Sequence, residues 1–233
     1  MRKKIGIVFM LLLLIGVAAV SQTAGERLRR RVQGEDVMTA GDVEKTVIVV
    51  DSGHGGSDPG KIGVNQKEEK DINLQIAQKV QKKLKEQKID VVMTRENEDG
   101  LGDSKVEDLK ARVELINQSQ PALAISIHQN SYPEESIHGA QVFYYTHSKE
   151  GEEAAKLLQQ TLLEVDPENH RQAKANDTYY MLKKTERPLV IIECGFLSNQ
   201  KEAELLGDDA YQEKIAAAIV KGVTEYLKRS VFL

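Results

Sequence analysis

The sequence predicts a single α/β domain, in which a mainly parallel mixed sheet carries helices on both faces. Two observations favour this fold class. Short apolar and β-branched segments alternate along the chain with longer segments that have a helical apolar period. The chain of 233 residues is also long enough for one domain with a substantial hydrophobic core, and short for two.

The predicted strands are short runs of β-branched and other apolar residues. The first, 46–51, reads Thr-Val-Ile-Val-Val-Asp and precedes a glycine-rich turn that contains His54. Further runs of this kind cover 89–94, 122–127, 140–145 and 189–192. Because predicted helices separate most of these strands, we expect most of the sheet to be parallel.

The predicted helices follow from apolar residues that recur every three or four positions. A long helix over 70–88 places these residues on one face: Ile72, Ile76, Val80 and Leu84. A second helix, over 106–117, turns a similar set inward: Leu109, Val113 and Ile116. Segments 151–165 and 208–227 complete the helices of a domain that spans residues 45–230.

The segment before this domain is interpreted as an export signal followed by a linker. Basic residues at 2–4 precede an apolar run over 5–20, which is typical of a signal peptide or a slightly short membrane anchor within residues 1–21. Residues 22–44 are polar and have no clear period, as in a linker. Both interpretations predict an exported protein, secreted or membrane-anchored, whose only membrane contact is this N-terminal segment.

The composition argues against a nucleic-acid partner. The formal net charge is −4, Trp is absent and aromatic residues make up 5% of the chain, so neither a basic surface nor a base-stacking platform is expected. The chain has one cysteine, Cys194, which excludes an intrachain disulfide. We therefore expect the hydrophobic core to hold the domain together.

Three polar side chains occupy equivalent places in the predicted sheet. His54 lies in the turn after the first strand, and His128 and Glu193 directly follow the strands that end at 127 and 192. The carboxyl ends of parallel strands share one edge of a sheet, and ligands of open α/β sheets bind there. We therefore expect these three residues to meet at that edge.

Glu69 joins this group from the start of the long helix, one short loop after His54. Taken alone, a glutamate in this place could simply complement the helix dipole, and each histidine could be an ordinary loop residue. Two histidines and one glutamate, however, are the protein ligands of many catalytic zinc sites, in which water takes the fourth position. We interpret His54, Glu69 and His128 as candidate ligands of one zinc ion.

Glu193 is an additional carboxylate in an apolar setting, between Ile192 and Cys194. Burying an unpaired carboxylate is costly, so a metal ion, another cation or catalysis is needed to explain it. We interpret Glu193 as the base that takes a proton from water and passes it to a leaving amine. A structural salt bridge to Arg187 or Lys183 is the alternative.

Three further polar residues are candidates for substrate binding: Asn130, Arg95 and Arg112. Asn130 lies two residues after His128, and Arg95 directly follows the predicted strand 89–94. Arg95 and Arg112 equally suit structural ion pairs, and the sequence does not distinguish the two roles.

Six short motifs occur in a fixed order along the chain. Each motif alone is a modest signal, but the six in order are highly specific. In order along the chain, they are 49–56 (VVDSGHGG), 69–74 (EKDINL), 93–95 (MTR), 125–131 (ISIHQNS), 139–145 (GAQVFYY) and 192–199 (IECGFLSN). Together they closely resemble the zinc-dependent N-acetylmuramoyl-L-alanine amidases of the amidase-3 family. The resemblance extends from about Val47 to Leu227, nearly the whole predicted domain.

The resemblance implies that residues 45–230 form a zinc amidase domain with one Zn²⁺ per chain. It assigns zinc binding to His54, Glu69 and His128, and catalysis to Glu193. It implies hydrolysis of the amide bond between N-acetylmuramic acid and L-alanine in peptidoglycan, so glycan strands with stem peptides are the expected partners. An accessory activator protein is also expected, because some relatives depend on one. Ser52 stands where the family usually has proline, which should loosen the turn without removing zinc.

The segments 139–145 and 193–199 most resemble the germination-specific amidases of spore formers. This likeness implies action on the spore cortex, formation of muramic-δ-lactam and a location in the forespore envelope. Two other functions remain as alternatives. One is a zinc peptidase that cuts stem peptides, and the other is a non-catalytic module that binds the wall or a partner. The intact set of candidate ligands argues against the second alternative.

Overall fold

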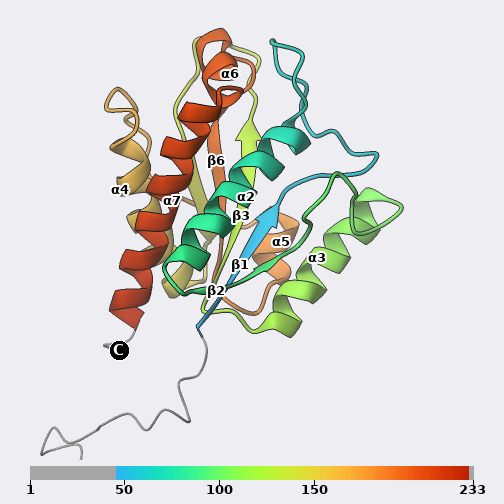
Figure 1. Ribbon diagram of the computed structural model, residues 1–233, viewed down its shortest axis with the longest axis vertical. Coiled ribbons are helices and arrows are strands. Elements are labelled where there is room, and N and C mark those ends of the chain that lie inside the picture. Colours follow the sequence, from blue (N-terminus) through green and yellow to red (C-terminus); the bar gives the residue numbers. More distant parts are fainter. Residues whose placement is uncertain (1–45, 231–233) are drawn as a thin grey trace, which may run out of the picture. The chain divides into compact units, whose positions relative to one another are not determined.

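The computed structural model describes residues 46–230, which form a six-stranded sheet with helices on both faces (Figure 1). The predicted fold class, a mainly parallel mixed α/β sheet, is confirmed. The predicted signal peptide or anchor (1–21) and the predicted linker (22–44) lie outside the described residues. Within the described part of the chain, no helix is both long enough and apolar enough to cross a membrane.

The sheet has the strand order β2, β1, β3, β6, β4 and β5. The first four strands run parallel, and they are β2 (Asp90–Met93), β1 (Val47–Ser52), β3 (Leu123–Asn130) and β6 (Leu189–Phe196). β4 (Gln141–Tyr145) is antiparallel to β6, and the short β5 (Lys174–Asn176) is parallel to β4. The carboxyl ends of β2, β1, β3 and β6 therefore share one edge of the sheet.

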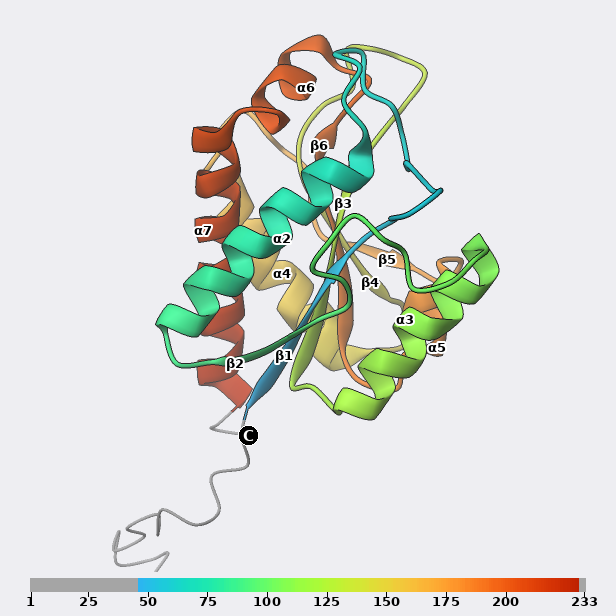
Figure 2. The same ribbon diagram turned by 45° about the vertical axis from the view of Figure 1, so that its right-hand side comes forward.

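Two groups of helices cover the two faces of the sheet (Figure 2). α2 (Glu69–Glu86) and α4 (Lys149–Leu163) cover one face, and α7 (Asp209–Ser230) packs against both of these helices. α3 (Lys105–Ser119) and α5 (Tyr180–Lys184) cover the other face, while the short α6 (Gln200–Leu206) follows β6. Each group buries its own apolar cluster against the sheet, as a three-layer α/β fold requires.

Local side-chain contacts explain where several helices begin. Ser104 precedes α3, and its Oγ accepts a hydrogen bond from the backbone N–H of Glu107 at 3.3 Å. Ser148 precedes α4 and accepts from the backbone N–H of Gly151 at 2.9 Å. α2 has no such side-chain cap. Its first residue, Glu69, is buried and is itself one of the candidate metal ligands.

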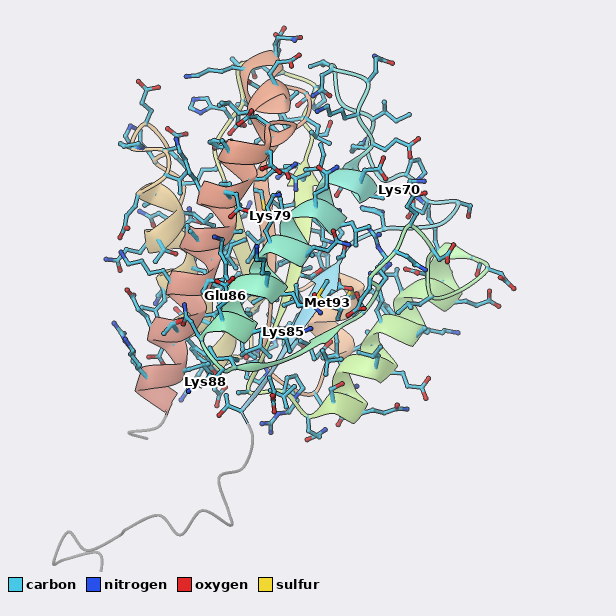
Figure 3. The ribbon with its side chains drawn as sticks, viewed as in Figure 1. Lys70, Lys79, Lys85, Glu86, Lys88 and Met93 are labelled. Atoms are coloured by element: carbon cyan, nitrogen blue, oxygen red, sulfur yellow. The ribbon has the colours of Figure 1, made fainter. Side chains whose placement is uncertain are left out.

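The outer side of α2 is rich in lysine, as Figure 3 shows with Lys70, Lys79 and Lys85. Lys79 Nζ lies 2.6 Å from Asp209 Oδ1 at the start of α7. Such exposed ion pairs contribute at most about 1 kcal/mol each, so apolar burial dominates the packing of α2 on α7. Ile76 on α2 and Ile219 on α7 are both fully buried in the shared core.

Strands β3 and β6 continue past their predicted ends at 127 and 192. His128 therefore lies inside β3 and pairs in register with Glu193 inside β6, just before a shift in register. Polar residues end the apolar run in the sequence, but backbone pairing continues through them. β5, α5 and α6 are not predicted, because elements this short have no visible apolar period.

Candidate metal centre and active site

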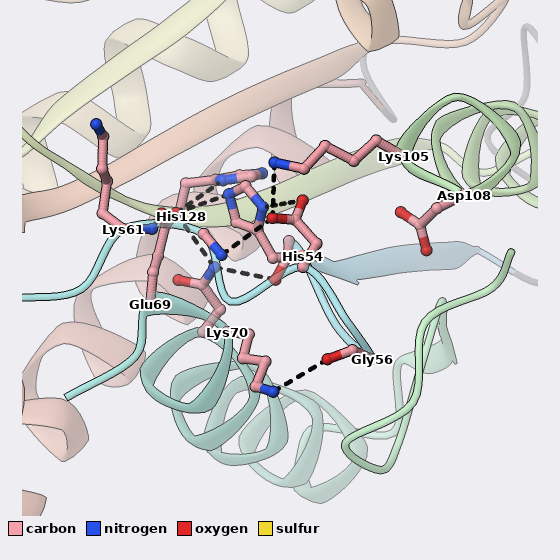
Figure 4. A network of polar contacts seen from close by, with 12 residues as sticks. His54, Gly56, Lys61, Glu69, Lys70, Lys105, Asp108 and His128 are labelled. Carbon is pink, nitrogen blue, oxygen red and sulfur yellow. Dashed lines mark hydrogen bonds and ion pairs between the residues drawn. The ribbon is translucent and has the colours of Figure 1, made fainter. Parts of the chain in front are cut away.

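The three predicted metal ligands meet at the carboxyl edge of the sheet (Figure 4). One ligand atom from each of His54, Glu69 and His128 lies within 4.8 Å of the other two. His54 Nε2 is 3.2 Å from Glu69 Oε1, and His128 Nδ1 is 3.1 Å from the same oxygen. Two imidazole nitrogens and one carboxylate oxygen thus converge, and this donor set suits zinc.

The turn after β1 brings His54 to the other two ligands through very close packing. His54 has a φ of 61°, a backbone conformation that residues other than glycine rarely adopt. A Cβ atom on Gly53 would overlap the ring of His128. A Cβ atom on Gly60 would lie 2.5 Å from Glu69 Oε2. Glycine at these two positions therefore leaves room for the ligand side chains.

Further contacts fix the orientation of the ligands. Asp58 Oδ2 lies 2.9 Å from His54 Nδ1, and Lys105 Nζ at the start of α3 lies 2.8 Å from Asp58 Oδ1. The backbone N–H of Lys61 donates to Glu69 Oε2 at 2.9 Å. A histidine whose second nitrogen faces a carboxylate is the usual arrangement of a zinc ligand, so the surroundings of His54 also fit the metal.

The electrostatics of the cluster favour an anionic Glu69. Burial raises the pKa of Glu69, but His128 and His54 outweigh it and lower that pKa well below its usual range. Burial lowers the pKa of His54, but the hydrogen bonds and charges of Glu69 and Asp58 outweigh it and raise that pKa to about 9. Glu69 and Asp58 create the negative potential that holds a proton on His54. The same potential would attract a divalent cation.

Glu193 lies beside this cluster, and one of its oxygens has no partner. The side chain is 9% exposed, and no described group forms a hydrogen bond with its buried Oε2. Within residues 46–229, no ion pair joins Glu193 to Arg187 or Lys183, and Arg187 Nε donates to Pro121 O at 2.9 Å instead. Burial raises the pKa of Glu193 to about 7, so its carboxyl group can exchange a proton near neutral pH.

Arg112 and Arg95 bind the backbone around His54. Arg112 donates to the carbonyl oxygens of Ser52 and His54, and its Nη1 lies 2.7 Å from Asp51 Oδ1. Arg95 Nε donates to the carbonyl oxygen of Ser52 at 3.0 Å. Only 1% of Arg112 and 4% of Arg95 is exposed. Both guanidinium groups therefore bind protein groups that shape the turn.

Asn130, the third candidate for substrate binding, lies at the end of β3 on the same edge as His128. It is half-buried, and its Oδ1 accepts a hydrogen bond from the backbone N–H of Ser131 at 2.8 Å. Sequence reasoning missed the residues that support the ligands, among them Asp58 and Asp51. Asp58 acts across a turn and Asp51 across neighbouring strands, and no local pattern marks either role.

Comparison with known proteins identifies the family. Residues 48–225 match the family described as N-acetylmuramoyl-L-alanine amidase. The chain belongs to the N-acetylmuramoyl-L-alanine amidase family. As expected of a member, this amidase is an enzyme that acts on the N-acetylmuramoyl-L-alanine bond of peptidoglycan.

The amidase is similar to relatives of known name and structure. It is 42% identical over 188 residues to the germination-specific N-acetylmuramoyl-L-alanine amidase of Bacillus subtilis (strain 168), a match that covers 77% of this chain and 79% of the relative. It also resembles the CwlD amidase from Clostridioides difficile, whose structure was solved in complex with the GerS lipoprotein. That match has a TM-score of 0.76 and 40% identity, and it covers 78% of this chain and 98% of the other. The predicted likeness to germination-specific amidases is confirmed.

Proposed function

We propose that this amidase is a zinc enzyme, in which His54, Glu69 and His128 hold one zinc ion per chain and Glu193 is the catalytic base. The convergence of the three ligand atoms within 4.8 Å carries the proposal. The carboxylate that faces His54 Nδ1 supports it, because zinc proteins hold ligand histidines in this way. The Oε2 atom of Glu193, which has no hydrogen-bond partner among the described residues, supports the role of Glu193 as the base.

The residues beside the metal then divide the work of amide hydrolysis. When bound, zinc acts as a Lewis acid toward a carbonyl oxygen and makes water easier to deprotonate. Glu193 pairs in register with His128 and so lies next to the ligands. Its carboxylate accepts the proton of the attacking water. With a pKa of about 7, it can then donate this proton to the leaving nitrogen of L-alanine.

Two substitutions test these roles. Glu193→Ala should bind zinc as the wild type does and lose at least about 100-fold in kcat, because it removes the base and no ligand. His128→Ala should lose zinc, as measured by elemental analysis of the purified protein. His147→Ala, which changes an exposed histidine, is the control. Undiminished hydrolysis by Glu193→Ala, or an unchanged zinc content in His128→Ala, would refute the respective role.

Product analysis separates this function from the two alternatives. With purified peptidoglycan, an amidase frees stem peptides that begin with L-alanine and leaves muramic acid intact. A zinc peptidase would leave L-alanine on the glycan, and a non-catalytic module would release nothing. Mass spectrometry of the soluble products distinguishes these outcomes, and L-alanine that stays on the glycan would refute the proposal.

We further propose that the substrate is the peptidoglycan of the spore cortex, that cleavage enables the formation of muramic-δ-lactam and that the enzyme serves germination. The similarity to a germination-specific amidase supports this proposal. Side-by-side digestion of cortex and vegetative peptidoglycan is the test. We expect faster release of stem peptides from cortex, and equal rates would contradict the proposed specificity.

The proposal for location and partners rests on the sequence and on one relative. We propose that residues 1–21 export or anchor the protein, that 22–44 are a linker and that 45–230 act as the catalytic domain outside the cytoplasm, in the forespore envelope. An accessory protein is a proposed partner, because the structure of the similar CwlD amidase was solved in a complex with the GerS lipoprotein. Fractionation of sporulating cells tests the location. Purification of the full chain under mild conditions tests for a bound partner.

A further inference from the structure

A fully buried asparagine, Asn73, lies one helical turn after Glu69 on α2. Its exposed fraction is 0%, and the buried residues beside it on the helix, Ile72 and Ile76, belong to the apolar core. Asparagine is a poor helix former, and a buried amide is costly unless it is hydrogen-bonded. Neither the helix nor the core therefore explains this side chain, and its polar contacts have to.

The nitrogen of the Asn73 side chain faces two groups of the metal-ligand cluster. Nδ2 donates a hydrogen bond to the carbonyl oxygen of Gly53, the residue before His54, at 3.1 Å. The same nitrogen donates to Glu69 Oε1, on the same face of the helix, at 3.4 Å. The opposite orientation of the amide would place its oxygen against these two oxygens. The contacts therefore assign a donor, and not an acceptor, to the side of the ligands.

The oxygen of the Asn73 side chain is held from β3. Gln129, the residue after His128, is 3% exposed, and its Nε2 donates to Asn73 Oδ1 at 3.1 Å. The backbone N–H of Gln129 donates to Glu69 Oε1, also at 3.1 Å. Glu69, Asn73 and Gln129 therefore form a closed ring of hydrogen bonds, in which each residue contacts the other two.

This ring reaches every segment that carries a candidate ligand. Asn73 lies on α2, binds the turn after β1 and is bound from β3, and the three ligands come from these same places. Contacts that fix a carboxylate beforehand spare it the loss of side-chain freedom when it binds a ligand. Loss of a group that holds a metal-binding carboxylate typically costs about 10- to 100-fold in metal affinity.

We propose that Asn73 and Gln129 are positioning residues of the metal centre, which fix the Glu69 carboxylate before the ion binds. Through Gly53, Asn73 also fixes the turn that carries His54. The inference rests on the proposed function, because it requires that the three candidate ligands bind zinc. It assigns neither residue a contact with the substrate, so their loss acts on metal affinity and coordination geometry.

Two substitutions and a matched control test this role. Asn73→Leu keeps a side chain of similar size and removes its hydrogen bonds. Gln129→Leu removes the support of Asn73 but keeps the backbone N–H that binds Glu69. Asn169→Leu is the control, because Asn169 is also buried, at 4% exposure, and its Nδ2 donates to the carbonyl oxygen of Ala140 at 2.9 Å. It lies in the connection between α4 and β5, outside the ring.

The measurement is a zinc titration of the full-length proteins after metal removal, in competition with a chromophoric chelator. The Kd for zinc should rise about 10- to 100-fold in Asn73→Leu. The rise should be smaller in Gln129→Leu, because one of its two contacts remains. With Co²⁺ in place of zinc, the visible absorption spectrum of both variants should change, since this spectrum reports coordination geometry. KM at saturating zinc should stay unchanged.

The control separates positioning from a general loss of stability. Asn169→Leu should lower the Tm of the metal-free protein and leave the zinc Kd and the Co²⁺ spectrum as in the wild type. A loss of zinc affinity in Asn169→Leu equal to that in Asn73→Leu would overturn the assignment. A raised KM at an unchanged zinc Kd would also overturn it. If Asn73→Leu did not fold, Gln129→Leu would decide, and a wild-type zinc Kd in that variant would refute the ring.

The same titration distinguishes this inference from the proposed function. If the wild type bound no zinc, the proposed metal centre would fail and the positioning role would fall with it. If the wild type bound zinc and hydrolysed the muramoyl amide, while both ring variants bound zinc with the wild-type Kd, the positioning role alone would be refuted.

Discussion

At Glu193, the proposed catalytic role and the stability of the fold make opposite demands on one side chain. The carboxyl group is 9% exposed and its Oε2 lacks a partner, so ionisation is unfavourable in the metal-free fold. The same burial raises its pKa to about 7, which suits a group that must accept a proton and release it again. Glu193 is therefore expected to reduce the stability of the metal-free protein, and in its proposed role it enables turnover.

We predict that Glu193→Gln abolishes turnover and stabilises the metal-free protein at pH 8. Glu193 has a folded-state pKa of about 7 against a usual 4.5, so the folded state loses stability as the pH rises from 4.5 to 7. The full loss is about 3 kcal/mol, and glutamine, which carries no charge, avoids it. Urea unfolding of the metal-free proteins at pH 5 and pH 8 measures the difference.

The dependence on pH is the decisive part of this measurement. The gain from Glu193→Gln should be larger at pH 8 than at pH 5. Glu186→Gln, at an exposed position, serves as the control and should change stability little at either pH. A gain that is equal at both pH values would show that ionisation of Glu193 is not its origin.

At the scale of elements, the turn after β1 depends on arginines from two other parts of the chain. Arg112 comes from α3 and Arg95 follows β2, and both donate to backbone carbonyl groups between Ser52 and His54. Asp51, at 0% exposure, is the buried anion that Arg112 pairs with. The position of His54, one of the candidate metal ligands, is thus set by contacts between three elements.

We predict that Arg112→Met destabilises the protein by about 3–5 kcal/mol, because it leaves Asp51 charged and buried without its partner. The double variant Asp51→Asn/Arg112→Met should recover part of this loss, since neither charge remains. Chemical unfolding of the wild type, both single variants and the double variant completes the cycle. If the loss in free energy of unfolding in the double variant equalled the sum of the losses in the two single variants, direct coupling would be contradicted.

The same pair predicts a response to acid. Burial raises the pKa of Asp51, but Arg112 and the hydroxyl groups of Ser126 and Thr94 outweigh it and lower that pKa below its usual 3.8. The stability that ionised Asp51 contributes is therefore present above about pH 4 and is lost as the pH falls through the lower folded-state pKa. The unfolding cycle at pH 7 should show a larger coupling energy than the same cycle at pH 3.

For the whole molecule, a metal ion would link parts of the chain that only the fold brings together. His54 follows β1, Glu69 begins α2 and His128 lies in β3, so an ion bound by all three joins both sides of the sheet edge. A ligand that binds only the folded state stabilises it by mass action. Zinc is therefore expected to raise the stability of the entire domain.

We predict that removal of zinc with a chelator lowers Tm by roughly 10 °C. Zinc at about 1,000 times its Kd contributes about 4 kcal/mol, and about 1 kcal/mol shifts the Tm of a domain of this size by roughly 2–4 °C. Differential scanning calorimetry with and without chelator is the measurement. The control is His128→Ala, whose Tm should not respond to chelator. An equal response in this variant would place the metal elsewhere.

The sequence predicts which candidate site residues meet much better than it predicts the residues that support them. His54, Glu69, His128 and Glu193 each lie at or near the boundary of a strand or helix, so topology alone brings them together. The side-chain contact of Gln129 with α2, by contrast, depends on how that helix packs against the sheet. Such contacts between distant segments are a tertiary property, and no local pattern encodes them.

The reversed direction of β4 has a practical consequence. Because β4 is antiparallel to β6, its last residue, Tyr145, lies at the edge of the sheet opposite Glu193. The connection from Tyr145 to Ser148 contains exposed residues. A fluorophore or an affinity tag inserted at 146–147 would therefore report on, or immobilise, a working enzyme without standing in the path of a glycan strand.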